Sequence, residues 1–116
     1  MWKFKENHLL EERMKECEEL RKRHSDRIPI VLERSARSDL KPYPPAKILC
    51  PANYKYQQFL RAVRSKFQLP QSHALYIFVN GKEMVTGDET LLSVYEKNKD
   101  PDGFLYMMYA EHPTLG

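Results

Sequence analysis

The most informative segment of the chain is Asp102-Gly103-Phe104-Leu105-Tyr106-Met107-Met108-Tyr109, in which a turn signal leads directly into an apolar and aromatic run. Aspartate and glycine favour turns, and aromatic side chains favour the pleated surface of a strand. We therefore expect a turn over residues 100–103 and a last strand over residues 104–109. No apolar run in the chain approaches the roughly 20 residues that a membrane span needs.

Three upstream segments are also typical of strands. Residues 28–33 predict one, with Pro29 tolerated because it lies near the strand's start. Residues 47–50 predict a second, short strand that ends before Pro51. Residues 75–79 lead into Asn80-Gly81, which predicts a hairpin because both turn residues can adopt positive φ.

Helical spacing of apolar residues appears in four segments. Residues 56–67 form an amphipathic helix, with Asn53 as its expected N-cap, and residues 90–95 a short helix. A short helix over residues 3–9 precedes a longer charged one. The apolar stripe expected to pack in that longer helix is Leu10, Met14, Cys17, Leu20 and His24.

The charge pattern argues against nucleic-acid binding. The net charge is +3, and residues 1–27 carry eight lysines and arginines against seven aspartates and glutamates. Pairs such as Glu18 and Lys22 stand four apart with the acid first, the favourable order on a solvated helix. Trp2 and Phe4 are expected to pack on the fold, with membrane or partner contact by Trp2 as the alternative.

The connecting loop over residues 35–45 is unusually rich in proline. Its segment Pro42-Tyr43-Pro44-Pro45 matches a PxxP ligand, but a stiffened connection between strands is the preferred interpretation. The N-terminus lacks the apolar stretch of a signal peptide, so both cysteines, Cys17 and Cys50, are expected to be free thiols in a reducing compartment.

Nothing in the sequence predicts an enzyme. The four histidines are scattered, and no Ser-His-Asp or Cys-His grouping, phosphate-binding loop or metal-ligand spacing is present in the sequence. No catalytic residue, metal or cofactor is therefore expected.

The order of elements is two helices, then strand, strand, helix, strand, short helix and strand. From Ile28 onward this is the order of a ubiquitin-like β-grasp. Three segments narrow the choice of family within this fold. They are Asp26-Arg27-Ile28-Pro29-Ile30-Val31, Phe78-Val79-Asn80, and Asp102-Gly103-Phe104-Leu105-Tyr106 with a glycine twelve residues beyond Phe104. Together they closely resemble the autophagy ubiquitin-like modifiers, the family of the GABA-receptor-associated protein and the microtubule-associated light chain.

The resemblance implies an α+β fold, a ubiquitin-like β-grasp with two additional N-terminal helices. Residues 1–27 would be the helical extension, 28–110 the core and 111–116 a flexible conjugation tail of one monomeric domain. An activating enzyme and a conjugating enzyme would join Gly116 to phosphatidylethanolamine, and a cysteine protease would trim longer precursors to that glycine. The protein would be cytoplasmic, and on the autophagosome membrane when lipidated.

The resemblance also implies docking of aromatic-x-x-aliphatic peptides from cargo receptors as an added strand beside residues 47–50. The positions matching the aromatic pocket are Glu16, Leu20, Pro29, Lys47, Leu49 and Phe104. Those matching the aliphatic pocket are Ile48, Cys50, Pro51, Tyr54, Phe59, Ala62 and Val63. Residues that would attract acidic flanks of the peptide are Arg27, Lys47, and Arg64 or Lys66. A second surface would fall at Tyr76, Ile77, Phe78 and Val79.

Several positions depart from the family's pattern. Ser25 replaces a usual proline, Cys50 a branched aliphatic residue, and Leu115 an aromatic residue before the glycine. These changes bear on pocket shape and on how a processing protease would recognise a precursor. The alternative function is an unconjugated β-grasp adaptor that binds peptides or microtubules.

Overall fold

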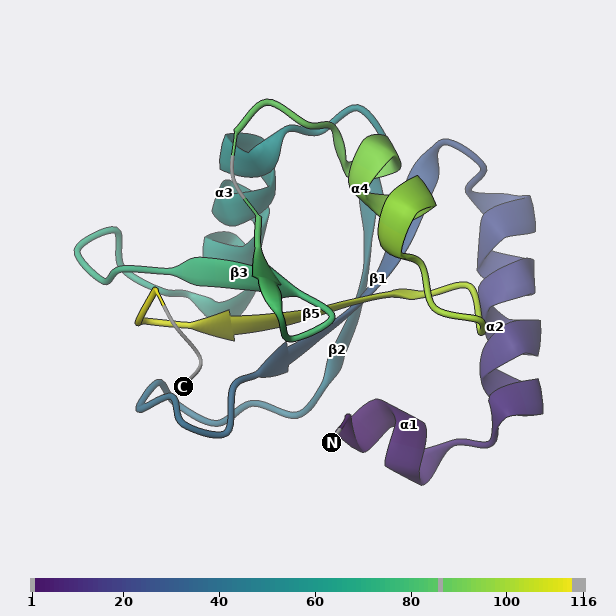
Figure 1. The fold of residues 1–116 in the computed structure, drawn as a ribbon, viewed down its shortest axis with the longest axis horizontal. Coiled ribbons are helices and arrows are strands. Elements are labelled where there is room, and N and C mark those ends of the chain that lie inside the picture. Colours follow the sequence, from purple (N-terminus) through teal and green to yellow (C-terminus); the bar gives the residue numbers. More distant parts are fainter. Residues whose placement is uncertain (1, 86, 114–116) are drawn as a thin grey trace.

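A computed structural model describes residues 2–85 and 87–113 (Figure 1). The expectations for Leu115 and Gly116 therefore lie outside the described residues. The elements, in chain order, are α1 Lys3–Asn7, α2 Leu10–Arg23, β1 Arg27–Arg34, β2 Ala46–Pro51, α3 Tyr56–Phe67, β3 Tyr76–Val79, β4 Glu83–Met84, α4 Leu91–Asn98 and β5 Leu105–Ala110.

The strands form one mixed sheet in the order β2-β1-β5-β3-β4. β1 and β5 run parallel at its centre, and the other neighbours are antiparallel. Helices α3 and α4 cover one face, and α1 and α2 lie toward the other side (Figure 1). This arrangement confirms the predicted α+β class.

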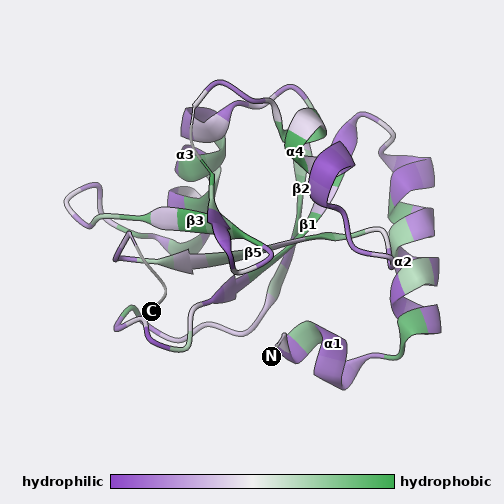
Figure 2. Ribbon diagram, in the orientation of Figure 1, coloured by the Kyte–Doolittle hydropathy of each residue, from purple (hydrophilic) through white to green (hydrophobic). Residues whose placement is uncertain are grey.

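The two faces follow from the alternation of side chains along the central strands. Ile28, Ile30 and Leu32 of β1 are fully buried toward α3 and α4. Val31 of β1 and Tyr106 of β5 are equally buried, but in a separate cluster beneath the N-terminal helices. Figure 2 shows many apolar residues along the central strands and hydrophilic turns along α2 and α4.

Aromatic contacts attach α1 to the sheet. The Trp2 ring meets Tyr106 edge-on at a centroid distance of 5.2 Å, and Phe4 meets Phe104 at 5.6 Å. The buried Glu33 carboxylate accepts hydrogen bonds from the backbone N–H groups of Lys3 and Phe4, both at 3.0 Å. The packing interpretation of Trp2 and Phe4 is thereby confirmed, because both side chains are less than a tenth exposed.

The predicted stripe of α2 is only partly buried. Leu10 and Met14 are each 46% exposed, whereas Arg13 and Cys17 face the sheet. Arg13 turns inward because a buried carboxylate, Asp102, lies 3.6 Å from its Nε atom. The buried face of α2 therefore contains a charged side chain where apolar spacing alone predicted Leu10 or Met14. On its outer surface the expected Glu18–Lys22 pair forms at 3.1 Å.

Several local details differ from the predictions. The N-cap of α3 is Lys55, not Asn53, and the Gln58 side chain accepts a hydrogen bond from the Lys55 N–H at 2.9 Å. The Asn80-Gly81 hairpin forms with both residues at positive φ and adds a two-residue strand, β4, to the predicted order. Helix α4 extends to Asn98, three residues beyond the predicted end.

Candidate peptide-docking site

The outer edge of β2 presents backbone hydrogen-bonding groups toward solvent. β2 pairs with β1 in the register Ile28↔Cys50 and Ile30↔Ile48, and the Ala52 N–H donates to the Asp26 carbonyl at 2.9 Å in the same register. Antiparallel pairs alternate between bonded and non-bonded positions. The N–H and C=O groups of Lys47 and Leu49 therefore point outward.

This alternation also explains how Pro29 fits inside a strand. Pro29 lies opposite Leu49, at a position where β1 and β2 exchange no hydrogen bond. Pairing with β5 begins one residue later, at Ile30↔Leu105. The missing proline N–H is therefore not required on either side.

A cavity of about 220 Å³ opens beside this edge on the α2 side. It is lined by Glu16, Leu20, Lys47, Ile48, Leu49 and Phe104. Five of the six positions predicted for the aromatic pocket line it, and Pro29 is buried opposite Leu49 on β1. The additional residue, Ile48, was expected in the aliphatic set.

The rim and floor of the cavity differ in character. An ion pair between the Lys47 ammonium and the Glu16 carboxylate spans the rim, where both side chains are more than a third exposed. Phe104 is fully buried. The site therefore combines an apolar floor with a polar, screened entrance.

A buried polar cluster fixes the position of Phe104. The Asp102 carboxylate accepts hydrogen bonds from the Phe104 N–H at 2.8 Å and from the Tyr106 hydroxyl at 2.5 Å. Burial raises the pKa of Asp102, and burial together with the bond to Asp102 raises the pKa of Tyr106. The tyrosine therefore remains a hydrogen-bond donor at neutral pH, and the cavity floor is held rigidly.

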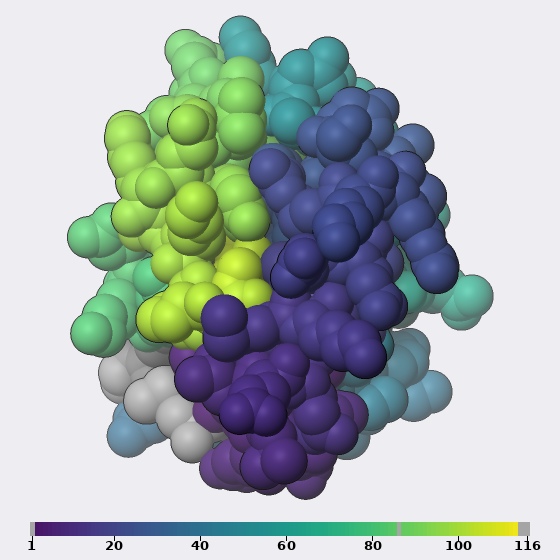
Figure 3. Space-filling view, turned by 90° about the vertical axis from the view of Figure 1, so that its right-hand side faces the viewer, coloured from purple at the N-terminus to yellow at the C-terminus, as the bar shows by residue number. Residues whose placement is uncertain are grey.

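Figure 3 shows how this region meets the N-terminal helices. The yellow-green segment that enters β5 lies directly beside α2 and α1. Gly103, within that segment, packs so closely on α2 that an added Cβ would lie 2.7 Å from the Cys17 Sγ atom. Helix α2 can therefore bring Glu16 and Leu20 to the cavity only because residue 103 has no side chain.

The positions predicted for the aliphatic pocket lie between β2 and α3. Cys50, Phe59 and Val63 belong to the main core. The remaining four are partly buried: Ile48, Pro51, Tyr54 and Ala62. Since the side chains of residues 48 and 50 point to the opposite face from 47 and 49, the two predicted pockets lie on different faces of the sheet edge.

The basic residues predicted to flank the groove have separate environments. Arg27 is exposed, and its Nη1 atom donates to the Leu49 carbonyl at 3.4 Å. Arg64 donates to the Pro70 carbonyl at 2.9 Å, so its guanidinium is partly engaged within the fold. Lys66 lines another cavity, of about 320 Å³, at the other end of β2.

The second predicted surface coincides with strand β3. Tyr76 is partly buried, while Ile77, Phe78 and Val79 are at most 5% exposed. Only Tyr76 of these four has substantial side-chain surface available in this conformation. A binding role for this strand stays a prediction.

Both cysteines are shielded thiols. Burial and the nearby Asp102 carboxylate raise the pKa of Cys17 to about 11, and burial raises the pKa of Cys50. At pH 8 a thiol with the pKa of Cys17 is ionised in only about one molecule in a thousand. We expect the folded protein to resist iodoacetamide at pH 8 and to gain two adducts by mass spectrometry in concentrated guanidinium chloride. Rapid labelling of the folded form would contradict this.

Comparison with known proteins identifies the family. The family model "Autophagy protein Atg8 ubiquitin like" matches residues 12–116. This chain belongs to the Atg8 family. It is 41% identical over 114 residues to autophagy-related protein 8B of Oryza sativa subsp. indica, covering 97% of this chain and 94% of the relative. It is 38% identical over 115 residues to autophagy-related protein 8 of Colletotrichum lindemuthianum, covering 98% and 93%.

A solved structure supports the same assignment. Trypanosoma brucei ATG8 superposes with a TM-score of 0.87 at 34% identity, covering 93% of this chain and 92% of that one. The predicted ubiquitin-like fold and the resemblance to autophagy modifiers are thereby confirmed. As an Atg8-family member the chain is an autophagy ubiquitin-like protein. In its described part, no helix has the length and apolar character needed to cross a membrane.

Proposed function

We propose that this Atg8-family protein is a ubiquitin-like modifier that is conjugated through Gly116 to phosphatidylethanolamine and recruits cargo receptors by docking aromatic-x-x-aliphatic peptides on β2. The observation that carries the docking proposal is the cavity of about 220 Å³ beside an unpaired strand edge. An extended peptide would form main-chain hydrogen bonds with Lys47 and Leu49, while its side chains enter the pockets.

The motif's spacing agrees with the placement of the two predicted pockets. Residues three apart in an extended chain point to opposite faces. The aromatic residue would enter the cavity on the α2 face, and the aliphatic residue would contact Tyr54 and Ala62 on the α3 face. Because the first pocket lies nearer the start of β2, the peptide would run parallel to that strand.

The conjugation proposal rests on family membership and on the glycine at position 116. The family's activating and conjugating enzymes would supply the adenylation and thioester chemistry, with this chain as their substrate and not as an enzyme. The lipidated form would lie on the autophagosome membrane and the free form in the cytoplasm. The outer edge of β2 would then bind cargo receptors at that membrane.

Replacing both Lys47 and Leu49 by alanine tests the docking proposal. The change removes the apolar wall and the rim cation of the cavity but keeps the backbone groups. We expect affinity for an aromatic-x-x-aliphatic peptide with acidic flanks to fall by about 1–3 kcal/mol, the range of an interface hot spot. Isothermal titration calorimetry at two salt concentrations would measure the loss and its electrostatic share.

A matched control is the pair Leu9→Ala and Lys82→Ala, which removes one exposed leucine and one exposed lysine away from the groove. This variant should bind the peptide as the wild type does. A peptide with alanine in place of its aromatic residue should bind weakly to every form. Equal affinity of the Lys47/Leu49 variant and the control would refute docking at this edge.

A further inference from the structure

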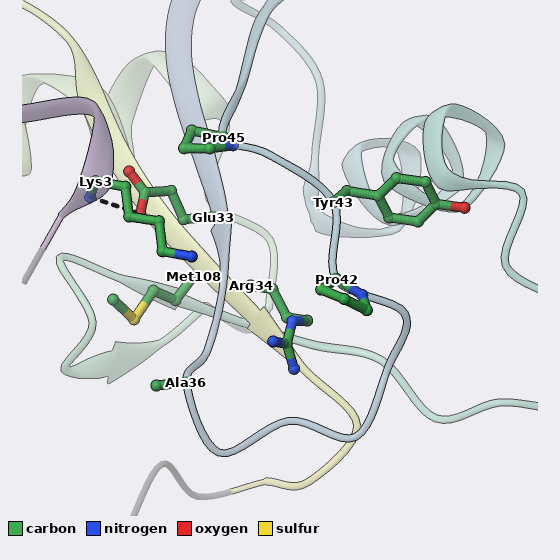
Figure 4. Close-up of a pocket in the computed structure, with 8 residues that line it drawn as sticks. All are labelled: Lys3, Glu33, Arg34, Ala36, Pro42, Tyr43, Pro45 and Met108. Carbon is green, nitrogen blue, oxygen red and sulfur yellow. Dashed lines mark hydrogen bonds between the residues drawn. The ribbon is translucent and has the colours of Figure 1, made fainter. Parts of the chain in front are cut away.

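A further cavity, of about 370 Å³, lies at the C-terminal end of β1. Its walls come from α1, the last residues of β1, the proline-rich loop and β5 (Figure 4). It is lined by Lys3, Glu33, Arg34, Ala36, Pro42, Tyr43, Pro45 and Met108. The proposed docking and conjugation leave this site unexplained.

The cavity exists because β2 ends before β1 does. Pairing between the two strands ends at Leu32↔Ala46, so no strand of the described chain lies beside Arg34 on that side. The loop over residues 36–45 arches across the gap and carries Pro42, Pro44 and Pro45. Because proline fixes φ, this wall is stiff and needs little ordering when a ligand binds.

Cationic groups dominate the cavity. The Lys3 and Arg34 side chains both line the space (Figure 4). The one carboxylate there, Glu33, already accepts the N–H groups of Lys3 and Phe4. Within the described ranges the Lys3 ammonium has no ion-pair partner.

The backbone adds a third donor. The Ser35 N–H donates to the Tyr109 carbonyl at 2.9 Å, so odd-numbered residues at this end of β1 turn their N–H groups toward β5. The Arg34 N–H therefore points the other way, toward the gap beside β1. Arg34 Nη1 donates to the Ser38 carbonyl, which anchors the guanidinium in the loop.

We propose that this cavity binds a phosphate ester, with its phosphoryl group held by the Lys3 ammonium, the Arg34 guanidinium and the Arg34 N–H. Donors from two segments suit a tetrahedral anion with several acceptor oxygens, and arginine forms paired bonds to phosphate. The organic part of the ester would contact Met108 and the ring carbons of Pro42 and Pro45. The ester has two possible sources, a soluble metabolite or a lipid headgroup.

Nuclear magnetic resonance titration of the full chain tests this site with O-phosphoethanolamine and inorganic phosphate as soluble probes. We expect saturable shifts centred on Arg34, Ala36 and Met108. Lys3→Gln and Arg34→Gln should each weaken binding by about tenfold, the effect of losing one charge-assisted contact. Arg61→Gln removes one exposed cation from α3 and should leave the affinity unchanged.

Vesicle co-sedimentation distinguishes the two sources. Phosphatidylcholine vesicles doped with phosphatidic acid should retain the protein through Lys3 and Arg34 if the ester is a lipid, and undoped vesicles should not. Soluble-probe binding without vesicle binding supports the metabolite source. The proposal is overturned if neither O-phosphoethanolamine nor inorganic phosphate causes saturable shifts. It is also overturned if the Lys3→Gln variant binds these probes as tightly as the Arg61→Gln variant does. Peptide docking on β2 would stand in either case.

Discussion

Gly103→Ala is expected to destabilise the fold by about 2–4 kcal/mol, because two separate costs add at one position. Gly103 has φ +95°, a backbone conformation that side chains disfavour. The added Cβ would also lie 2.7 Å from the Cys17 Sγ atom, in the closely packed contact between α2 and the turn before β5. Urea denaturation followed by circular dichroism would measure the change in the free energy of unfolding.

Gly87→Ala separates the two costs. Gly87 has φ +79°, but no atom of the described residues lies within 4 Å of a Cβ built there. It should therefore lose only the backbone contribution, about 1 kcal/mol. Adding Cys17→Ala to Gly103→Ala should recover part of the loss in a double-mutant cycle. Equal destabilisation by the two glycine substitutions would show that the contact with α2 contributes nothing.

The same substitution connects stability to the candidate site. Cys17 lies between Glu16 and Leu20 on α2, and these two residues line the cavity beside β2. Displacing α2 to accommodate a methyl group would move that wall away from Phe104. We therefore expect Gly103→Ala, but not Gly87→Ala, also to weaken peptide binding.

The sequence predicted the strands well because they are short apolar runs bounded by turn or proline signals. The structure shifts the ends of the strands expected over residues 28–33 and 104–109 by one residue. β4 was missed as an element since two residues, both exposed, carry no apolar pattern. The N-cap at Lys55 has no sequence signal of the usual kind, since its backbone bonds to the Gln58 side chain.

The rotation of α2 could not be predicted from periodicity. Leu10 and Met14 have the expected spacing, yet the buried face contains Arg13, whose partner Asp102 is 89 residues away in the chain. Apolar spacing shows only that a helix has a packing face. Removing one partner of a buried ion pair would leave an unpaired buried charge, and only the folded structure reveals this pairing.

The candidate site was predicted through resemblance more than through pattern. Lys47 and Leu49 alone indicate a short strand, and nothing local shows that its outer edge is open. The cavity depends on three segments meeting, namely α2, β2 and the start of β5. The cavity at Lys3 and Arg34 was not predicted at all, because its wall is a loop whose prolines indicated only stiffness.

Gly116→Ala should nearly abolish conjugation to phosphatidylethanolamine while leaving the fold and peptide docking unchanged. A methyl group beside the reacting carbonyl would obstruct attack and displace the carboxylate within the narrow channel of the activating enzyme. A displacement of about 1 Å in such a step can reduce the rate about 100-fold. The measurement is a reconstituted reaction with the family's activating and conjugating enzymes, ATP and phosphatidylethanolamine vesicles, with mass spectrometry of the products.

Gly87→Ala is the matched control, since it makes the same chemical change at an open position far along the chain from the reacting end. It should be lipidated at the wild-type rate, and both variants should bind an aromatic-x-x-aliphatic peptide with equal affinity. Loss of lipidation with intact peptide docking would show that conjugation through Gly116 and peptide binding on β2 are separate functions. If Gly116→Ala were lipidated normally, or were recruited to membranes in cells as the wild type is, the protein would act as an unconjugated adaptor through β2 alone.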